Sequence, residues 1–132
     1  MMKWLSLLAL LSLGAPMAAA QPPAESAIKT MTGWFSDAEC AAPRLARGVF
    51  APNGAECVKR CLARGVKAVF IADQAKAAFA VTNYPNVAND VGYYVELTGV
   101  VDAAAKTISV TSVKQLESVG AMCRLPRKGT QQ

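Results

Sequence analysis

The alternation of apolar and polar side chains predicts that this chain is built mainly from β-strands. Residues 30–36, TMTGWFS, are predicted to form the first strand, with Trp34 and Phe35 as its bulky apolar members. Two short apolar runs, residues 66–72 and 77–82, are joined by the turn sequence DQAK and predict the second and third strands. Alternate positions of these two runs are expected to share one face of a sheet, namely Phe70, Phe79 and Val81.

The strongest alternation lies in a hairpin formed by residues 93–101, YYVELTGVV, and residues 107–113, TISVTSV. Gly99 falls on the apolar side of this hairpin. A missing side chain at that position permits a β-bulge, or the strong coiling that closes a sheet into a small barrel. The other members of the apolar side are Tyr93, Val95, Leu97 and Val101.

Two helices are predicted between the strands. Residues 53–65, NGAECVKRCLARG, begin with Asn53 as a helix N-cap and end at Gly65, which can adopt positive φ. Residues 83–92 predict a short helix between the two hairpins. Residues 38–54 contain scattered Pro and Gly without a sustained period, and they are predicted to be a loop.

The resulting order, β-α-β-β-α-β-β, predicts a mainly β (α+β) domain: a five-stranded OB-like barrel with a helix inserted after the first strand. The alternative is an open antiparallel sheet with two helices on one face. We expect this domain to span residues 30–123. A flexible segment at residues 21–29 would precede it, and a flexible basic tail at residues 124–132 would follow it.

The first 20 residues show the three-part pattern of a secretory signal peptide: an early lysine, an apolar run and a small-residue stretch that ends at Ala20. The apolar run is roughly half the ~20 residues that a bilayer-spanning helix needs, so no membrane span is expected after cleavage. Cleavage would leave 112 of the 132 residues, a size typical of one domain. The pattern therefore predicts a periplasmic or secreted protein.

An even number of cysteines in a small exported chain predicts disulfide bonds, here two. Positions one helical turn apart hold their Cβ atoms about 6 Å apart, beyond the reach of a disulfide, which argues against a bond between Cys57 and Cys61. Cys40 is therefore expected to bond to Cys57 or Cys61, and Cys123 to the other. Each bridge would add on the order of 3 to 4 kcal/mol of stability.

Two chemical alternatives compete for the same cysteines. Four thiolates can bind zinc or copper(I), but the chain has neither a C-x2-C knuckle nor any histidine, so no metal site and no cofactor are predicted. A redox role is disfavoured by the spacing, because three residues separate Cys57 from Cys61 where a C-x-x-C motif has two.

The sequence contains no catalytic signature. Without histidine no Ser-His or Cys-His pair can form, and the carboxylates are scattered, so the chain is predicted not to be an enzyme. The net charge of +5, about +4 after loss of Lys3, favours loose association with anionic partners. A candidate ligand surface combines a basic helix face with aromatic side chains, and its members are Lys59, Arg60, Arg64, Lys67, Tyr84, Tyr93 and Tyr94.

Three stretches resemble a family of small secreted bacterial domains of unknown function: TMTGWFSDAEC from Thr30, CVKRCLARGVKAVFIAD from Cys57 and YYVELTGVV from Tyr93. That family shows a G-x-x-x-D-x-x-C opening, a C-x-x-x-C helix ending in Gly and a closing V-x-V-x-G hairpin of OB type. It often has a histidine after the first cysteine, where this chain has AAPRLAR, which weakens any metal site borrowed from the resemblance. The hairpin also resembles that of periplasmic OB-fold proteins connected with envelope stress. The matching positions are Gly33, Asp37, Cys40, Cys57, Cys61, Gly65 and Gly99.

The expected function is that of an exported, non-enzymatic binding or envelope-associated module stapled by two disulfides. Its partner would be an envelope or extracellular ligand, such as an anionic glycan or a peptide. No nucleic acid is expected, because the chain is predicted to be exported. The alternatives are a thiol-dependent metal-binding (zinc or copper) or redox protein, and an inhibitor of a secreted enzyme.

Overall fold

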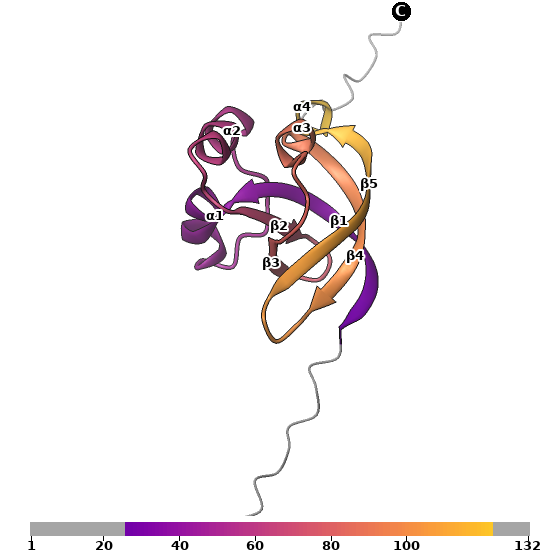
Figure 1. Ribbon diagram of the computed structural model, residues 1–132. Helices are drawn as coiled ribbons and strands as arrows, with labels where there is room; N and C mark the ends of the chain where they lie inside the picture. The colour runs from indigo at the N-terminus through magenta and orange to yellow at the C-terminus, as the bar shows by residue number, and fades with distance from the viewer. Residues whose placement is uncertain (1–25, 123–132) are drawn as a thin grey trace, which may run out of the picture.

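Five strands form one mixed sheet that closes in a ring in the computed structural model, which describes residues 26–122 (Figure 1). The strands are β1 (Ala27–Asp37), β2 (Ala68–Ala72), β3 (Ala77–Val81), β4 (Tyr93–Asp102) and β5 (Thr107–Ser118). Their order around the ring is β1-β2-β3-β5-β4, and β4 pairs with β1. All neighbours are antiparallel except β3 and β5, which pair in parallel. The predicted strands and mainly β class are confirmed, and the alternative of an open antiparallel sheet is wrong.

β1 closes the ring because it pairs with different strands along its length. Residues 27–33 pair with β4, and residues 33–37 pair with β2. Gly33 belongs to both pairings, and a Cβ atom there would collide with the backbone carbonyl oxygen of Ile71 in β2. Glycine is therefore required where β1 passes from one neighbour to the other.

Gly99 lies at the bulge predicted for the second hairpin. The register between β4 and β5 shifts between Thr98 and Gly99. A Cβ atom on Gly99 would lie 2.5 Å from the carbonyl oxygen of Ser109, so only glycine lets the two strands approach this closely. The prediction of an irregularity at this residue is confirmed.

The helices of the described region are α1 (Ala38–Leu45), α2 (Ala55–Ala63), α3 (Val87–Asp90) and α4 (Val119–Met122). The predicted loop over residues 38–54 is wrong in its first half, because Asp37 caps α1 and starts a helix there. The predicted element order therefore lacks α1, and it also lacks α4. α2 ends as predicted, with Gly65 at a φ of +88°. No helix within residues 26–122 has both the length and the apolar character to cross a membrane.

The outer strands are longer than the sequence pattern predicted. β1 begins at Ala27, so residues 27–29 belong to the sheet and not to the predicted flexible segment. β5 continues to Ser118, beyond the predicted end of its strand. The predicted signal peptide at residues 1–20, Cys123 and the predicted tail at residues 124–132 lie outside the described residues.

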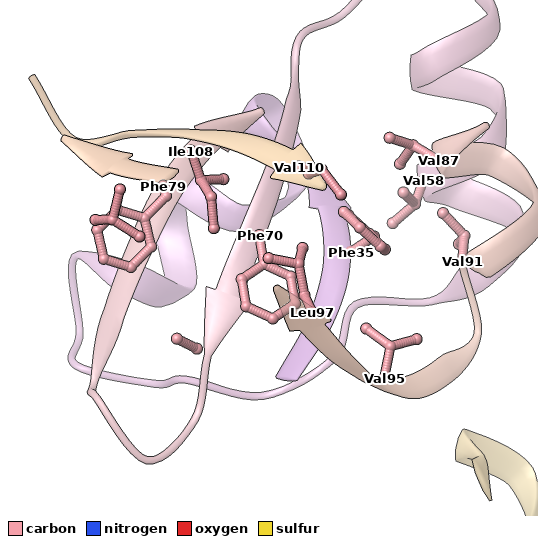
Figure 2. Close-up of a cluster of buried hydrophobic side chains, with 12 residues drawn as sticks. Phe35, Val58, Phe70, Phe79, Val87, Val91, Val95, Leu97, Ile108 and Val110 are labelled. Carbon is pink, nitrogen blue, oxygen red and sulfur yellow. The ribbon is translucent and has the colours of Figure 1, made fainter. Parts of the chain in front are cut away.

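Apolar side chains from all five strands fill the ring (Figure 2). Phe70 and Phe79 are register partners in β2 and β3, so they lie on one face of the sheet as predicted. Both are buried, and Val81 is partly buried against the same core cluster. Figure 2 shows Val58 of α2 and Val87 of α3 close together beside Phe35. These helices therefore pack onto the same core as the strands.

Candidate three-cysteine site

The first turn of α1 places Cys40. Oδ1 of Asp37 accepts hydrogen bonds from the backbone N–H groups of Glu39 (3.0 Å) and Cys40 (2.9 Å). A short side chain that accepts from the free amides of the first turn is the usual N-cap, and it fixes the residue at which the helix begins. Cys40 therefore lies just after the junction of β1 and α1, with its side chain half-buried.

α2 presents Cys57 and Cys61 one turn apart. Cys61 is buried, with 6% of its surface exposed, whereas Cys57 is exposed. Asn53 does not cap this helix, which corrects the prediction: its Nδ2 donates to the Cys40 carbonyl oxygen (2.8 Å), and its Oδ1 accepts from the Ser36 hydroxyl (2.8 Å). Asn53 thus fixes the start of α2 against α1 and β1.

The three sulfur atoms form a cluster, which we call the three-cysteine site. Sγ of Cys40 lies 3.2 Å from Sγ of Cys57 and 3.9 Å from Sγ of Cys61, and all three atoms lie within 4.8 Å of one another. A disulfide is about 2.05 Å long, so these three cysteines are free thiols in this structure. The predicted bond from Cys40 to Cys57 or Cys61 joins residues that are neighbours here, and it stays a prediction. Cys123, the fourth predicted partner, lies outside the described residues.

A buried carboxylate adjoins the three-cysteine site. Asp37 is fully buried, and its Oδ2 atom accepts no hydrogen bond from residues 26–122. The Asp37 side chain beside it raises the pKa of Cys40 far above its ordinary value, and burial and the neighbouring thiols add to this effect. The local field at Cys40 therefore favours the protonated thiol.

Two arginines face the thiols of α2. Nη2 of Arg64 donates to Sγ of Cys61 (3.2 Å) and to Oε2 of Glu39 (3.2 Å), and the bond to Cys61 is the main reason that the pKa of Arg64 is raised. A pocket of about 290 Å³ opens here, lined by Cys57, Arg60, Cys61 and Arg64. Cys57 and Cys61 therefore border a hollow whose charged lining residues are both cationic.

The structure divides the residues predicted as a ligand surface. Arg60 and Arg64 lie together at the pocket beside the cysteines. Lys59 and Tyr84 line another pocket, of about 320 Å³, between α2 and α3. The other members lie outside both pockets, namely Lys67, Tyr93 and Tyr94. The basic helix face is thus split between two hollows.

Two of the predicted aromatic residues make internal contacts. The ring of Tyr84 stacks on Phe35, with centroids 5.7 Å apart. Tyr94 packs on Trp34 with centroids 5.2 Å apart, and its hydroxyl donates to Oδ2 of Asp73 (2.9 Å). Part of each ring is therefore used in internal packing and is not available for stacking on a ligand.

Asp37 and Glu39 adjoin the site but were not among the predicted site residues. In the sequence, Asp37 was a position shared with the resembled family, directly after the first predicted strand, and had no predicted role at the cysteines. Its spacing before Cys40 is the signal that was available, because an N-cap aspartate places its carboxylate against the first turn of the helix that follows. Glu39 gave no such signal, since its partner Arg64 belongs to another helix.

The chain matches no protein-family model, no curated protein and no solved structure. Its function must therefore be argued from the geometry of the three-cysteine site and of the fold that carries it.

Proposed function

We propose that this protein is an exported, non-enzymatic module of OB type that binds a soft metal ion, copper(I) or zinc, through Cys40, Cys57 and Cys61. The observation that carries the proposal is the cluster itself: three sulfur atoms from two helices lie within 4.8 Å of one another. Cysteines that serve only as small apolar side chains have no need to gather their sulfur atoms at one point.

The sulfur spacing supports a metal–thiolate centre. Zinc binds thiolate sulfur at about 2.3 Å, which places the sulfur atoms of a tetrahedral site about 3.8 Å apart. The distance of 3.9 Å between Cys40 and Cys61 is close to that value. Cys57 lies closer to Cys40, at 3.2 Å, and rotation of its exposed side chain would supply the extra ~0.6 Å.

The donor set favours soft ions. Thiolate ligands select copper(I) and zinc over hard ions such as magnesium and calcium. The cluster consists of sulfur alone, and the chain has no histidine that could complete a mixed site. Three sulfur donors would suit copper(I), whereas zinc would need a further ligand to reach its usual four.

The charges around the site act in both directions. Arg64, 3.2 Å from Sγ of Cys61, and Arg60 in the same pocket would offset the negative charge of a metal–thiolate centre. The buried Asp37 carboxylate opposes thiolate formation at Cys40. A bound cation would reverse that balance, since it attracts both the carboxylate and the thiolate and displaces the thiol proton.

The OB type and export are also part of the proposal. The closed ring of five strands, with β5 between β3 and β4, supports an OB barrel, as do the glycines at the bends of β1 and β4. The three-cysteine site then lies on α1 and α2, an insertion between the first two strands. The pattern of the first 20 residues supports export.

The predicted disulfides compete with this site for the same atoms, because Cys40 cannot bond to a second sulfur and retain a thiolate for a metal. A chain with two bridges would match the sequence expectation of a stapled module for an anionic glycan or a peptide, or of an enzyme inhibitor. Those functions stay predictions, and a count of free thiols separates them from the metal site.

The test combines a thiol count with metal analysis on full-length protein purified anaerobically from the periplasm. We expect alkylatable thiols and one copper(I) or zinc ion per chain, with the ion lost in Cys40→Ser, Cys57→Ser and Cys61→Ser and retained in Cys123→Ser. Protein without alkylatable thiols and without metal would overturn the proposal. Loss of the ion in Cys123→Ser as well would contradict the assignment to three cysteines.

A further inference from the structure

We infer that Cys57 and the pocket beside it form an exchange site for a small anionic disulfide, with Cys40 as the second thiol that closes a Cys40–Cys57 bond. The exchange requires no metal ion, so this inference goes beyond the proposed function and can be tested on metal-free protein. In this scheme Cys57 reacts first, Cys40 closes the bond and Cys61 stays a free thiol. The two arginines of the pocket attract the negative charge of the ligand.

The exposure of the thiols sets the order of events. Cys57 is exposed and lines the pocket, so an incoming disulfide reaches its sulfur first. Cys40 is half-buried and lies 3.2 Å from Sγ of Cys57, which places it next to any mixed disulfide formed there. Cys61 is buried, its Sγ lies farther from Sγ of Cys40, at 3.9 Å, and its sulfur accepts a hydrogen bond from Arg64.

The lining of the pocket sets the charge of the ligand. Its charged members are Arg60 and Arg64, and the nearby carboxylates of Glu39 and Glu56 are not among the lining residues. Arg64 forms an ion pair with Glu39, with Nη2 and Oε2 3.2 Å apart. Arg60 forms no ion pair within the described part of the chain, so it is the arginine more available to a ligand carboxylate. The pocket therefore favours a disulfide that carries carboxylates.

The exchange proceeds in two balanced steps. In the first step the Cys57 thiolate attacks one sulfur of the small disulfide, a Cys57–sulfur bond forms, and the original sulfur–sulfur bond breaks. The first small thiolate leaves and takes up the proton that Cys57 lost. In the second step Sγ of Cys40 attacks Sγ of Cys57, and the second small thiol leaves with the proton of Cys40. Two protein thiols are oxidised, and one disulfide is reduced to two small thiols.

Closure of the Cys40–Cys57 bond would leave Cys61 as the last free thiol of the site. Because two of the three sulfur donors are consumed, a metal ion held there would be released. This consequence alone rests on the proposed function, while the exchange itself does not. The pocket would then act as the point at which the surrounding disulfide pool controls the site.

The test uses reduced, metal-free Cys123→Ser protein and three probes that differ in charge: glutathione disulfide (anionic), hydroxyethyl disulfide (neutral) and cystamine (cationic). Acid quenching and intact-mass analysis follow the mixed disulfide and the closed product, and peptide mapping identifies the bonded cysteines. The rate of each probe with the protein is divided by its rate with a small free thiol, which removes differences in the intrinsic reactivity of the three disulfides. At low salt we expect glutathione disulfide to be roughly tenfold faster than cystamine on this scale, with Cys40–Cys57 as the product. Equal scaled rates, or another pairing, would overturn the inference.

Variants separate the roles of the residues. Cys40→Ser should accumulate the mixed disulfide on Cys57. Arg60→Ala should slow glutathione disulfide roughly threefold and leave the neutral probe unchanged, whereas Glu39→Gln, which frees Arg64, should accelerate it. Lys114→Ala, which removes an exposed cation of β5 outside the pocket, is the charge-matched control and should change nothing. If Lys114→Ala slowed the reaction with glutathione disulfide as much as Arg60→Ala does, the pocket would have no role in the exchange. These exchange rates are measured without metal, so they stay the same even if the protein proves not to bind a metal ion.

Discussion

The Tyr84 hydroxyl donates a hydrogen bond of 2.7 Å to Oδ2 of Asp90 and so ties the segment before α3 to the last residue of that helix. Asp90 is buried, with 6% of its surface exposed, and its Oδ1 accepts from Nε2 of Gln115 in β5 at 2.8 Å. Both carboxylate oxygens thus have partners. α3 is only four residues long, too short to be stable as a helix by itself. These hydrogen bonds therefore help to hold it in place on the ring.

This contact predicts a loss of stability at alkaline pH. Burial and the bond to Asp90 raise the pKa of Tyr84 from 10 to about 12. The folded state therefore favours the neutral phenol: its stabilisation is complete below about pH 10 and is lost as the pH rises through about 12. Between about pH 10 and 12 we expect the free energy of unfolding of the wild-type protein to fall by about 1 to 2 kcal/mol more than that of Tyr84→Phe. This is less than the full pKa shift implies, because the Tyr84 ring is partly exposed. Urea unfolding of both proteins at a series of pH values measures this difference. If the free energy of unfolding fell equally with pH in both proteins, the prediction would be wrong.

The Asp37 cap predicts a different response to two substitutions. Asp37→Ala removes the acceptor for the Glu39 and Cys40 amides and should cost about 1 to 2 kcal/mol of unfolding free energy. Asp37→Asn retains an acceptor oxygen and should cost clearly less. Asp102→Ala is the matched control, because Asp102 accepts from the Ala105 amide in an exposed turn. Denaturant unfolding compares the three, and equal losses for Asp37→Asn and Asp37→Ala would show that capping is not the main role of this side chain.

The glycines at the strand bends predict large effects from a single methyl group. Gly33→Ala places a Cβ atom against the Ile71 carbonyl oxygen, and the backbone there cannot move without breaking the pairing of β1 and β2. We expect a loss on the order of 3 kcal/mol or more, and a similar loss for Gly99→Ala. Gly120→Ala meets no atom within 4 Å and should change stability by less than about 0.5 kcal/mol. Thermal unfolding of the three variants measures these losses. A small loss for Gly33→Ala would mean that β1 and β2 can move apart at this point without a large cost in stability.

The strands could be predicted because their signal is local. The hairpin of β4 and β5 is encoded by alternation within each strand, and Gly99 marks its own irregularity by lacking a side chain. The closure of the ring is not encoded in this way. It depends on β1 pairing with both β2 and β4, which are far apart in the sequence. The pattern favoured closure only by analogy with known barrels.

The three-cysteine site could be predicted only in part. Alternation and helix punctuation placed Cys57 and Cys61 together, since both lie on one helix. Cys40 was expected beside them only as a disulfide partner of Cys57 or Cys61, inferred from the number of cysteines. The helix α1 that carries Cys40 was missed, because its start is set by a single cap and its sequence includes Pro43. Asn53 adds a second cause: its sequence position suggests a cap, but its side chain bonds Cys40 and Ser36, an outcome decided by tertiary packing.

Metal binding predicts a rise in stability that depends on Cys57. An ion bound only by the folded chain stabilises it by RT ln(1 + [M]/Kd), about 2.7 kcal/mol at a free concentration 100 times Kd. We expect reduced Cys123→Ser protein to gain stability of this order with copper(I), and to gain none with magnesium or calcium, which prefer oxygen ligands. Addition of Cys57→Ser should abolish the gain and cost little in the metal-free protein, because Cys57 is exposed, whereas Cys61→Ser would also disturb a buried position. Urea unfolding with and without copper(I) measures both quantities. An undiminished gain in the Cys57→Ser protein would place the ion elsewhere on the chain.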